Sequence, residues 1–215
     1  MKETLSEHYD NVSNNLNIEK LKSYGSKDIN QFLRAPYIYI EDNFILNTNL
    51  NNKNILDYCC GNGSYSILPA LNEANVYGVD ISDKSIELAK KRSEILNISN
   101  KCNFNSGDAE NLKFEDNFFD LVLCYGSLSY LDLNESFKEL KRVLKPGGKL
   151  VIVDSLGYNP LINRNRRKNI KNYASNYVDQ LSTITHKDLK ISLKYFDSYS
   201  IKYFDFFTIL GKFMK

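Results

Sequence analysis

Cysteine and histidine are scarce in this chain of 215 residues, which has four of the former and two of the latter. No two cysteines form a Cys-x-x-Cys pair and neither histidine is near a cysteine in the sequence, so we predict no metal site. Adjacent cysteines in an apolar run are typical of small buried thiols, so we predict a cytoplasmic protein without a disulfide framework. The cysteines are Cys59, Cys60, Cys102 and Cys124.

Long apolar runs and a strong charge of one sign are also missing. No stretch approaches the ~18 consecutive apolar residues of a membrane span, and the polar first ten residues do not resemble a signal peptide. The formal net charge is only +2, which gives little general attraction to nucleic acid. We therefore expect no membrane span and no nucleic-acid partner.

The pattern after residue 52 alternates between short apolar runs and amphipathic helices. Such alternation predicts a parallel sheet with helices on both faces, that is, a three-layer Rossmann-like α/β sandwich with a mostly parallel central sheet. We expect strands at 54–59, 75–81, 101–105, 119–124 and 149–154, and helices at 64–72, 84–97 and 134–144.

The two ends of the chain differ from this repeating pattern. Residues 1–50 are expected to be a helical cap or lid of the same domain, and residues 51–215 the domain that carries the sheet. Tyr9, Phe32 and Tyr37 contribute to the apolar content of the cap. The tail from residue 183 is expected to be a helix followed by one or two strands that end within 203–210.

The strongest local signal is the segment 55–64, Ile-Leu-Asp-Tyr-Cys-Cys-Gly-Asn-Gly-Ser, where the first strand meets a helix. Gly61 and Gly63 permit a tight turn and the close approach of a ligand. Asp80 ends the second strand, at about the distance where an acidic residue accepts hydrogen bonds from a ribose. Asp80 is alternatively a helix cap, although Ser82 is the better capping candidate. Asp108 follows the third strand, where a carboxylate can meet the exocyclic amine of an adenine.

These residues resemble the signatures of one enzyme family. Asp57-x-Cys59-x-Gly61-x-Gly63 is similar to the cofactor loop of class I S-adenosylmethionine-dependent methyltransferases, whose usual form is acidic-x-Gly-x-Gly-x-Gly. One departure is that Cys59 stands where the family has its first glycine. Later signatures of the family are resembled, in the expected order, by the segments 79–82, 107–109, 119–122 and 144–148.

The resemblance implies S-adenosylmethionine as the cofactor and assigns it binding residues. Asp57 and the turn at Cys59, Gly61 and Gly63 would hold its amino-acid part, and Asp80 with Ile81 its ribose. Asp108 and the Ala109 backbone would recognise adenine. Tyr125 and Gly126 would sit beside the sulfonium, and Tyr9 and Tyr37 would close over the cofactor from the cap. The cofactor-binding prediction is therefore Tyr9, Asp57, Cys59, Gly61, Gly63, Asp80, Ile81, Asp108, Ala109, Tyr125 and Gly126.

Catalysis by such an enzyme needs alignment more than a reactive side chain, because methyl transfer is an in-line displacement at an activated carbon. No catalytic residue can be assigned from the sequence. The candidates for a general base are His8, Tyr130 and His186. The acceptor-binding candidates are Ser127, Tyr130, Arg164 and Arg167, the last two because a guanidinium can hold a carboxylate or phosphate.

The sequence thus predicts a methyltransferase that acts on an oxygen or nitrogen atom of a small molecule, as a monomer or homodimer. Two alternatives remain at this point. A nicotinamide-dependent oxidoreductase would need a third glycine where Ser66 stands, and the chain has no Tyr-x-x-x-Lys pair. A non-catalytic adenosyl-binding or partner subunit with the same fold is the other alternative.

Overall fold

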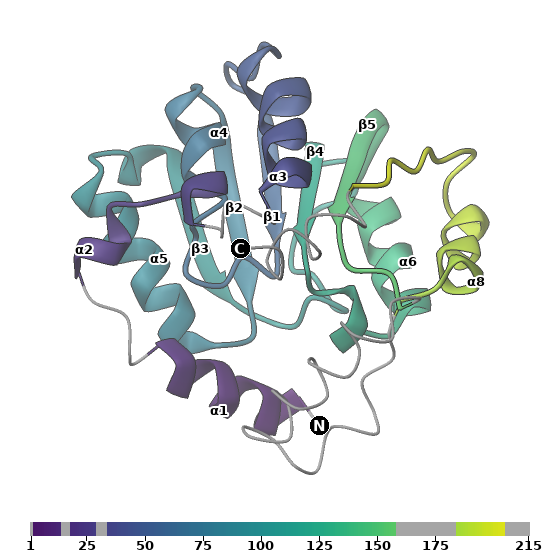
Figure 1. Ribbon diagram of the computed structural model, residues 1–215, viewed down its shortest axis with the longest axis horizontal. Coiled ribbons are helices and arrows are strands. Elements are labelled where there is room, and N and C mark those ends of the chain that lie inside the picture. Colours follow the sequence, from purple (N-terminus) through teal and green to yellow (C-terminus); the bar gives the residue numbers. More distant parts are fainter. Residues whose placement is uncertain (1, 14–17, 29–33, 158–183, 205–215) are drawn as a thin grey trace, which may run out of the picture.

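The computed structural model describes residues 2–13, 18–28, 34–157 and 184–204, and these form a central sheet flanked by helices (Figure 1). The sheet has five parallel strands in the order β3-β2-β1-β4-β5, which confirms the predicted Rossmann-like architecture. The strands are β1 (Asn54–Tyr58), β2 (Asn75–Asp80), β3 (Cys102–Ser106), β4 (Phe119–Tyr125) and β5 (Leu144–Val153).

Helices cover both faces of the sheet because neighbouring residues of each strand point to opposite sides. Leu56 and Tyr58 of β1 pack in one apolar cluster with Phe137 of α6, whereas Ile55 packs in another with Ile67 of α4. The connecting helices are α4 (Ile67–Leu71), α5 (Asp83–Ile95) and α6 (Leu133–Val143), with short 3₁₀ turns η4 (Ser99–Lys101) and η5 (Leu128–Tyr130).

The described part of the first 50 residues is helical, as predicted, and α1 packs along α5. Three side chains of α1 join it to the start of α5. Ser6 donates to the carbonyl of Ile81 (3.0 Å), and Asp10 accepts from the Lys84 amide (3.1 Å). The third contact is between Ser13 Oγ and Ser85 Oγ (2.9 Å). The helical elements of this segment are α1 (Lys2–Ser13), α2 (Ile18–Leu21), the 3₁₀ turn η1 (Gly25–Asp28), α3 (Ala35–Ile40) and the π-helical turn η3 (Glu41–Leu46).

Two predicted boundaries in the sheet domain are wrong. β5 begins five residues before the predicted start, at Leu144, because pairing with β4 starts as soon as α6 ends. Its register then shifts: Phe119 pairs with Leu144 but Leu121 with Lys149, so the Pro-Gly-Gly turn bulges out of the strand. The predicted helix 64–72 is shorter, because a turn from Gly63 to Ser66 precedes it.

The tail begins with the predicted helix, α8 (His186–Leu189), which continues as the 3₁₀ turn η6 (Lys190–Lys194). Thr185 starts α8 with a capping box, exchanging hydrogen bonds with Asp188. Residues 201–204 carry no strand, and the rest of the predicted strand region lies outside the described residues. Among the helices that the structure describes, none has the length and apolar content to cross a membrane.

Candidate active site

The strand order places a topological switch point at the carboxyl ends of β1 and β4. In the sheet, β2 lies on one side of β1 and β4 lies on the other (Figure 1). The chain that leaves β1 continues toward β2 and the chain that leaves β4 continues toward β5, so the loops after β1 and β4 diverge. In open parallel sheets ligands bind in the crevice that this divergence leaves. The loops after β1, β2, β3 and β4 carry most of the residues predicted for the site.

The turn after β1 has a backbone that favours glycine at three positions. Cys59, Gly61 and Gly63 have φ angles of +58°, +52° and +72°. A Cβ on Gly63 would lie 2.9 Å from the Cβ of Ala89, so a glycine is needed there for the turn to pack on α5. A Cβ on Gly61 would meet nothing within 4 Å, so this side of the turn faces open space.

Cys59 therefore occupies a left-handed conformation that costs an L-residue about 1–2 kcal/mol. We expect Cys59→Gly to be more stable than Cys59→Ala by about 0.5–1 kcal/mol, after the larger chain entropy of glycine in the unfolded state is subtracted. Both variants lose the thiol, so their difference in urea-unfolding free energy isolates the backbone strain. Equal stabilities of the two variants would show that the turn carries no such strain.

Asp80 connects the turn after β1 to the end of β2. Its buried carboxylate accepts hydrogen bonds from the amides of Gly61 (2.8 Å) and Ser82 (3.0 Å). Ser82, not Asp80, caps α5, because its hydroxyl accepts from the Ser85 amide (3.0 Å). Burial raises the pKa of Asp80, while the hydrogen bonds from the amides act against that rise. Ile81 follows directly and is held to α1 through its carbonyl.

Asp57 lies deeper, with 2% of its surface exposed. Burial raises the pKa of its carboxyl to about 7, and the nearby Asp80 charge adds to the rise. Its hydrogen-bond donor is the hydroxyl of Ser66, at 2.5 Å, which acts to lower that pKa. Ser66 thus has a role of its own at the position where a dinucleotide-binding turn would need a third glycine.

Asp108 lies in the loop after β3, where the amino-terminal helix reaches it. The Lys2 ammonium is 2.6 Å from a carboxylate oxygen of Asp108 and 2.6 Å from one of Glu110. Partial burial acts to raise the pKa of Asp108, but the hydrogen bonds from Lys2 and the Glu110 amide lower it overall. The carbonyl of the next residue, Ala109, accepts from the buried Tyr58 hydroxyl (3.0 Å).

Tyr9 of α1 lies close to residues at the ends of β1, β2 and β4 or in the loops after them, namely Cys59, Asp80 and Tyr130. Its ring meets that of Tyr130 edge-on, with the centroids 6.1 Å apart. The pKa of the Tyr9 phenol is raised by burial and by the neighbouring Tyr130 phenol and Asp80 carboxylate. The His8 ring lies against Tyr9 at 5.2 Å. The structure therefore brings Tyr9, Tyr130 and His8 to the same part of the site.

Three tyrosines from separate elements stack together at the switch point; we call Tyr37, Tyr65 and Tyr125 the tyrosine cluster. Tyr65 and Tyr125 have ring centroids 4.2 Å apart, and Tyr37 of α3 lies 5.4 Å from Tyr65 and 5.7 Å from Tyr125. Burial and the nearby Asp57 carboxylate raise the pKa of Tyr125. Sequence reasoning missed Tyr65, although its place within the glycine turn after β1 was a usable signal.

The remaining predicted residues divide into those near β4 and those away from it. Gly126 follows β4 with φ +69°, and a Cβ there would meet nothing within 4 Å. Ser127 is buried, with its hydroxyl 3.1 Å from Cys124 Sγ. Helix α8, which begins at His186, lies beyond β5 from β1 (Figure 1). The His186 ring contacts the ring of Tyr203. Arg164 and Arg167 lie outside the described residues.

The family of this chain follows from a comparison of its sequence with profiles of protein families. The profile of the methyltransferase-domain family matches residues 49–198, which include all five strands and the loops described above. The chain belongs to the methyltransferase family. It is a class I domain, and its cofactor is S-adenosylmethionine, as the resemblance of the glycine turn and of the carboxylates at the strand ends to the family's signatures led us to predict.

Curated relatives of this methyltransferase match it over part of its length. A demethylmenaquinone methyltransferase of Lactobacillus johnsonii is 37% identical over 112 residues, which are 50% of this chain and 46% of that protein. A ubiquinone/menaquinone biosynthesis C-methyltransferase of Rickettsia prowazekii is 35% identical over 121 residues, which are 53% of this chain and 49% of that protein. The chain thus spans about half the length of these curated relatives.

Solved structures show the same fold at lower sequence identity. A geranyl diphosphate C-methyltransferase from Streptomyces coelicolor superposes with a TM-score of 0.66, covering 90% of this chain and 78% of that one at 16% identity.

Within the described ranges of the methyltransferase, no group of three or more histidines, cysteines or acidic residues is arranged to hold a metal ion.

Proposed function

We propose that this methyltransferase transfers the methyl group of S-adenosylmethionine to a ring carbon of a prenylated quinone-type acceptor in its reduced form. The supporting observation is the 35–37% identity to relatives named for demethylmenaquinone methylation and for C-methylation in ubiquinone and menaquinone biosynthesis. This proposal replaces the oxygen or nitrogen acceptor expected from the sequence with a carbon acceptor.

The residues at the ends of the strands fit the cofactor. Cβ atoms on Gly61 and Gly126 would project into open space, so the two turns that flank the switch point leave room for a ligand. Three carboxylates match its hydrogen-bond donors: Asp57 the amino group, Asp80 the ribose hydroxyls and Asp108 the exocyclic amine. Bound there, the cofactor supplies a methyl group activated by positive sulfur. The remaining contacts come from Tyr9, Cys59, Gly63, Ile81, Ala109 and Tyr125.

The tyrosine cluster fits the acceptor. A flat unsaturated ring binds well against aromatic side chains in stacked or edge-on geometry. Tyr125 ends β4 at the switch point, next to the open side of Gly126, so a ring that packs on the cluster would lie close to the transferred methyl group. A carbon acceptor needs orientation above all, because its nucleophilic lobe is perpendicular to the ring plane.

The chemistry balances without a further reagent. Loss of a hydroxyl proton from a reduced quinone would enrich the adjacent ring carbon in electrons, and the site would hold that carbon in line with the methyl group that the cofactor supplies. Transfer would form a carbon–carbon bond and break the carbon–sulfur bond; the ring carbon would then lose its proton and the ring oxygen would regain one. The net products would be the methylated quinol, S-adenosylhomocysteine and one proton. Of the three bases predicted from the sequence, His8 and Tyr130 lie beside Tyr9 at the site. His186 begins α8, and this helix lies beyond β5 from the ends of β1 and β4 (Figure 1).

The test has two stages. Calorimetric titration should detect binding of S-adenosylmethionine and of S-adenosylhomocysteine but not of NADH. Transfer of labelled methyl should then occur to a detergent-dispersed demethylmenaquinol and not to the same compound in its oxidised form. Binding without transfer to any ring acceptor would favour the non-catalytic alternative. Binding of NADH alone would point to the oxidoreductase and contradict the proposal.

A further inference from the structure

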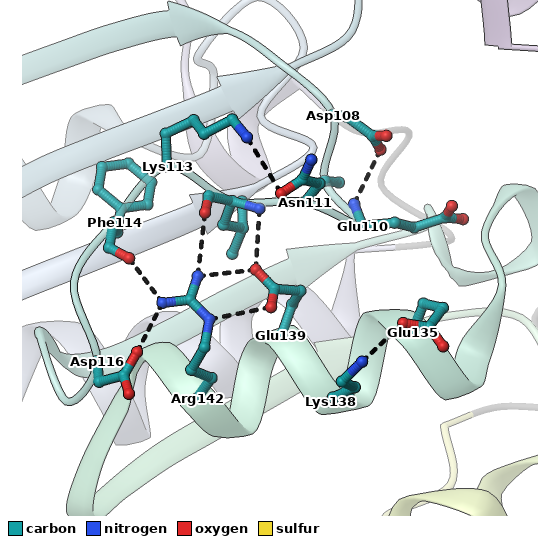
Figure 2. Close-up of polar contacts among 12 residues, drawn as sticks. Asp108, Glu110, Asn111, Lys113, Phe114, Asp116, Glu135, Lys138, Glu139 and Arg142 are labelled. Atoms are coloured by element: carbon teal, nitrogen blue, oxygen red, sulfur yellow. Dashed lines mark hydrogen bonds and ion pairs between the residues drawn. The ribbon is translucent and has the colours of Figure 1, made fainter.

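Two charged side chains of α6 turn toward the loop that follows Asp108. Glu139 and Arg142 lie three residues apart on the helix, so they share a face. Figure 2 shows the Arg142 guanidinium between Glu139, Phe114 and Asp116, whereas Lys138 and Glu135 of the same helix pair with each other. The first pair contacts the loop of the sheet domain and the second lies on the exposed side of the helix.

The guanidinium of Arg142 binds the loop at three points. It donates to the carbonyl of Leu112 (3.0 Å), to the carbonyl of Phe114 (2.7 Å) and to the Asp116 carboxylate (2.8 Å). Two of these acceptors are backbone atoms, so the contact determines the path of the chain and does not depend on the side chains at those positions.

Glu139 completes the contact from the other side. Its carboxylate accepts from the Leu112 amide (3.0 Å) and from two nitrogens of Arg142 (2.9 and 2.8 Å). Leu112 therefore has both its amide and its carbonyl bound by one side-chain pair. The arginine holds the pKa of Glu139 below its usual range, so the carboxylate stays charged near neutral pH.

The loop is also attached to the start of α6. The Asp132 amide, at the amino-terminal cap of the helix, donates to the Glu110 carboxylate (2.6 Å). The Glu110 amide in turn donates to Asp108 (2.9 Å) (Figure 2). Asp108 and Ala109 thus lie a few residues from several contacts with α6, in addition to those that Lys2 and Tyr58 make with the same loop.

We propose that Glu139 and Arg142 are positioning residues for adenine recognition: by holding residues 112–116 on α6 they aim the Asp108 carboxylate at the exocyclic amine of the cofactor. The inference rests on the proposed role of Asp108. Lysine cannot replace this arginine, because a single ammonium lacks the planar fork that reaches two carbonyls and two carboxylates together.

The experiment compares two ligands that differ at one edge of the base. S-adenosylhomocysteine has the exocyclic amine, and S-inosylhomocysteine has a carbonyl oxygen in its place and a proton on the neighbouring ring nitrogen. The wild-type protein should prefer the first, because Asp108 accepts from the amine. In Arg142→Lys the affinity for S-adenosylhomocysteine should fall roughly tenfold or more, the range of one charge-assisted hydrogen bond. The affinity for S-inosylhomocysteine should change little, so the preference should be lost.

Three further variants make the result specific. Asp108→Asn should lose the same preference, since it removes the carboxylate itself. Lys138→Gln, which breaks the exposed pair with Glu135 on the same helix, should keep it. Glu139→Gln keeps the size of the side chain but not its charge, and should behave like Arg142→Lys. It provides the measurement if the arginine variant does not fold.

The outcomes separate the inference from the function on which it rests. A wild-type protein that binds neither ligand would contradict the proposed function. A wild-type preference that persists in Arg142→Lys and Glu139→Gln, with both ligands equally weakened, would mean that the pair only stabilises the fold and would overturn the inference.

Discussion

Replacing Asp80 with alanine is expected to weaken the binding of S-adenosylmethionine at least a hundredfold. The carboxylate has two tasks in the proposed site. It accepts from the Gly61 and Ser82 amides, which ties the glycine turn to the end of β2. Its remaining lone pairs would accept from the ribose hydroxyls. Two hydrogen bonds to a charged acceptor contribute about 3 kcal/mol together, which corresponds to roughly a hundredfold in affinity.

Calorimetry on matched variants checks this result. Asp80→Asn keeps one carbonyl acceptor and should lose less affinity than Asp80→Ala. Asp83→Ala removes a neighbouring acidic residue whose side chain is exposed in the first turn of α5, and should bind the cofactor like the wild type. An Asp80→Ala protein that binds S-adenosylmethionine as tightly as the wild type would exclude the ribose role.

Cofactor binding is expected to strengthen as the pH rises through about 7, because the Asp57 carboxyl has its pKa there in the free protein. Below that pH the group is mainly protonated and cannot pair with the cationic amino group of the cofactor. The affinity should therefore fall by about tenfold for each pH unit below the pKa of Asp57 and level off above it.

The stability of the free protein should depend on pH in the opposite direction to the affinity for the cofactor. Burial raises the pKa of Asp57 above its model-compound value of 3.8, so the folded state keeps a proton that the unfolded state has already lost. The folded state binds more protons between about pH 4 and 7, and the free energy of unfolding should fall as the pH rises through this window. Thermal melts with and without cofactor, from pH 5 to pH 8, measure both effects.

A control variant assigns the effect to this carboxyl. Asp80, Tyr125 and the four cysteines are also ionisable and lie close to Asp57, but burial raises the pKa of Tyr125 and of each thiol away from this range. In Asp57→Asn the pH dependence of binding should disappear. If Asp57→Asn retained the slope and Asp80→Asn abolished it, the Asp57 carboxyl would not be the titrating group.

The strands were predictable because a buried parallel strand is a short apolar run between polar segments, and β1, β2 and β4 fit that description. β5 was placed too late. Its first residues, Leu144 to Gly148, contain a proline and two glycines, which are signals for a turn. They pair with β4 all the same, because a bulge absorbs the extra residues.

The carboxylates of the site were predictable for a topological reason. The carboxyl ends of parallel strands meet at one edge of the sheet, so acidic residues within or just beyond the last residues of β1, β2 and β3 come to the same edge whatever lies between them. Asp57, Asp80 and Asp108 are such residues. Their protonation was not predictable, since the pKa of Asp57 depends on how deeply the folded chain buries it.

The sequence by itself determined the fold class, because apolar runs that alternate with helices are a local pattern. It also indicated the cofactor, because the glycine turn and the acidic residues at the ends of the first three strands resemble the class I methyltransferase signatures. Only the tertiary structure decided which distant residues support that site. Lys2 meets Asp108, Tyr37 meets Tyr125, and Arg142 binds the backbone near Leu112. Such pairs follow from the packing of helices on the sheet, which brings together residues whose separation along the chain has no characteristic spacing.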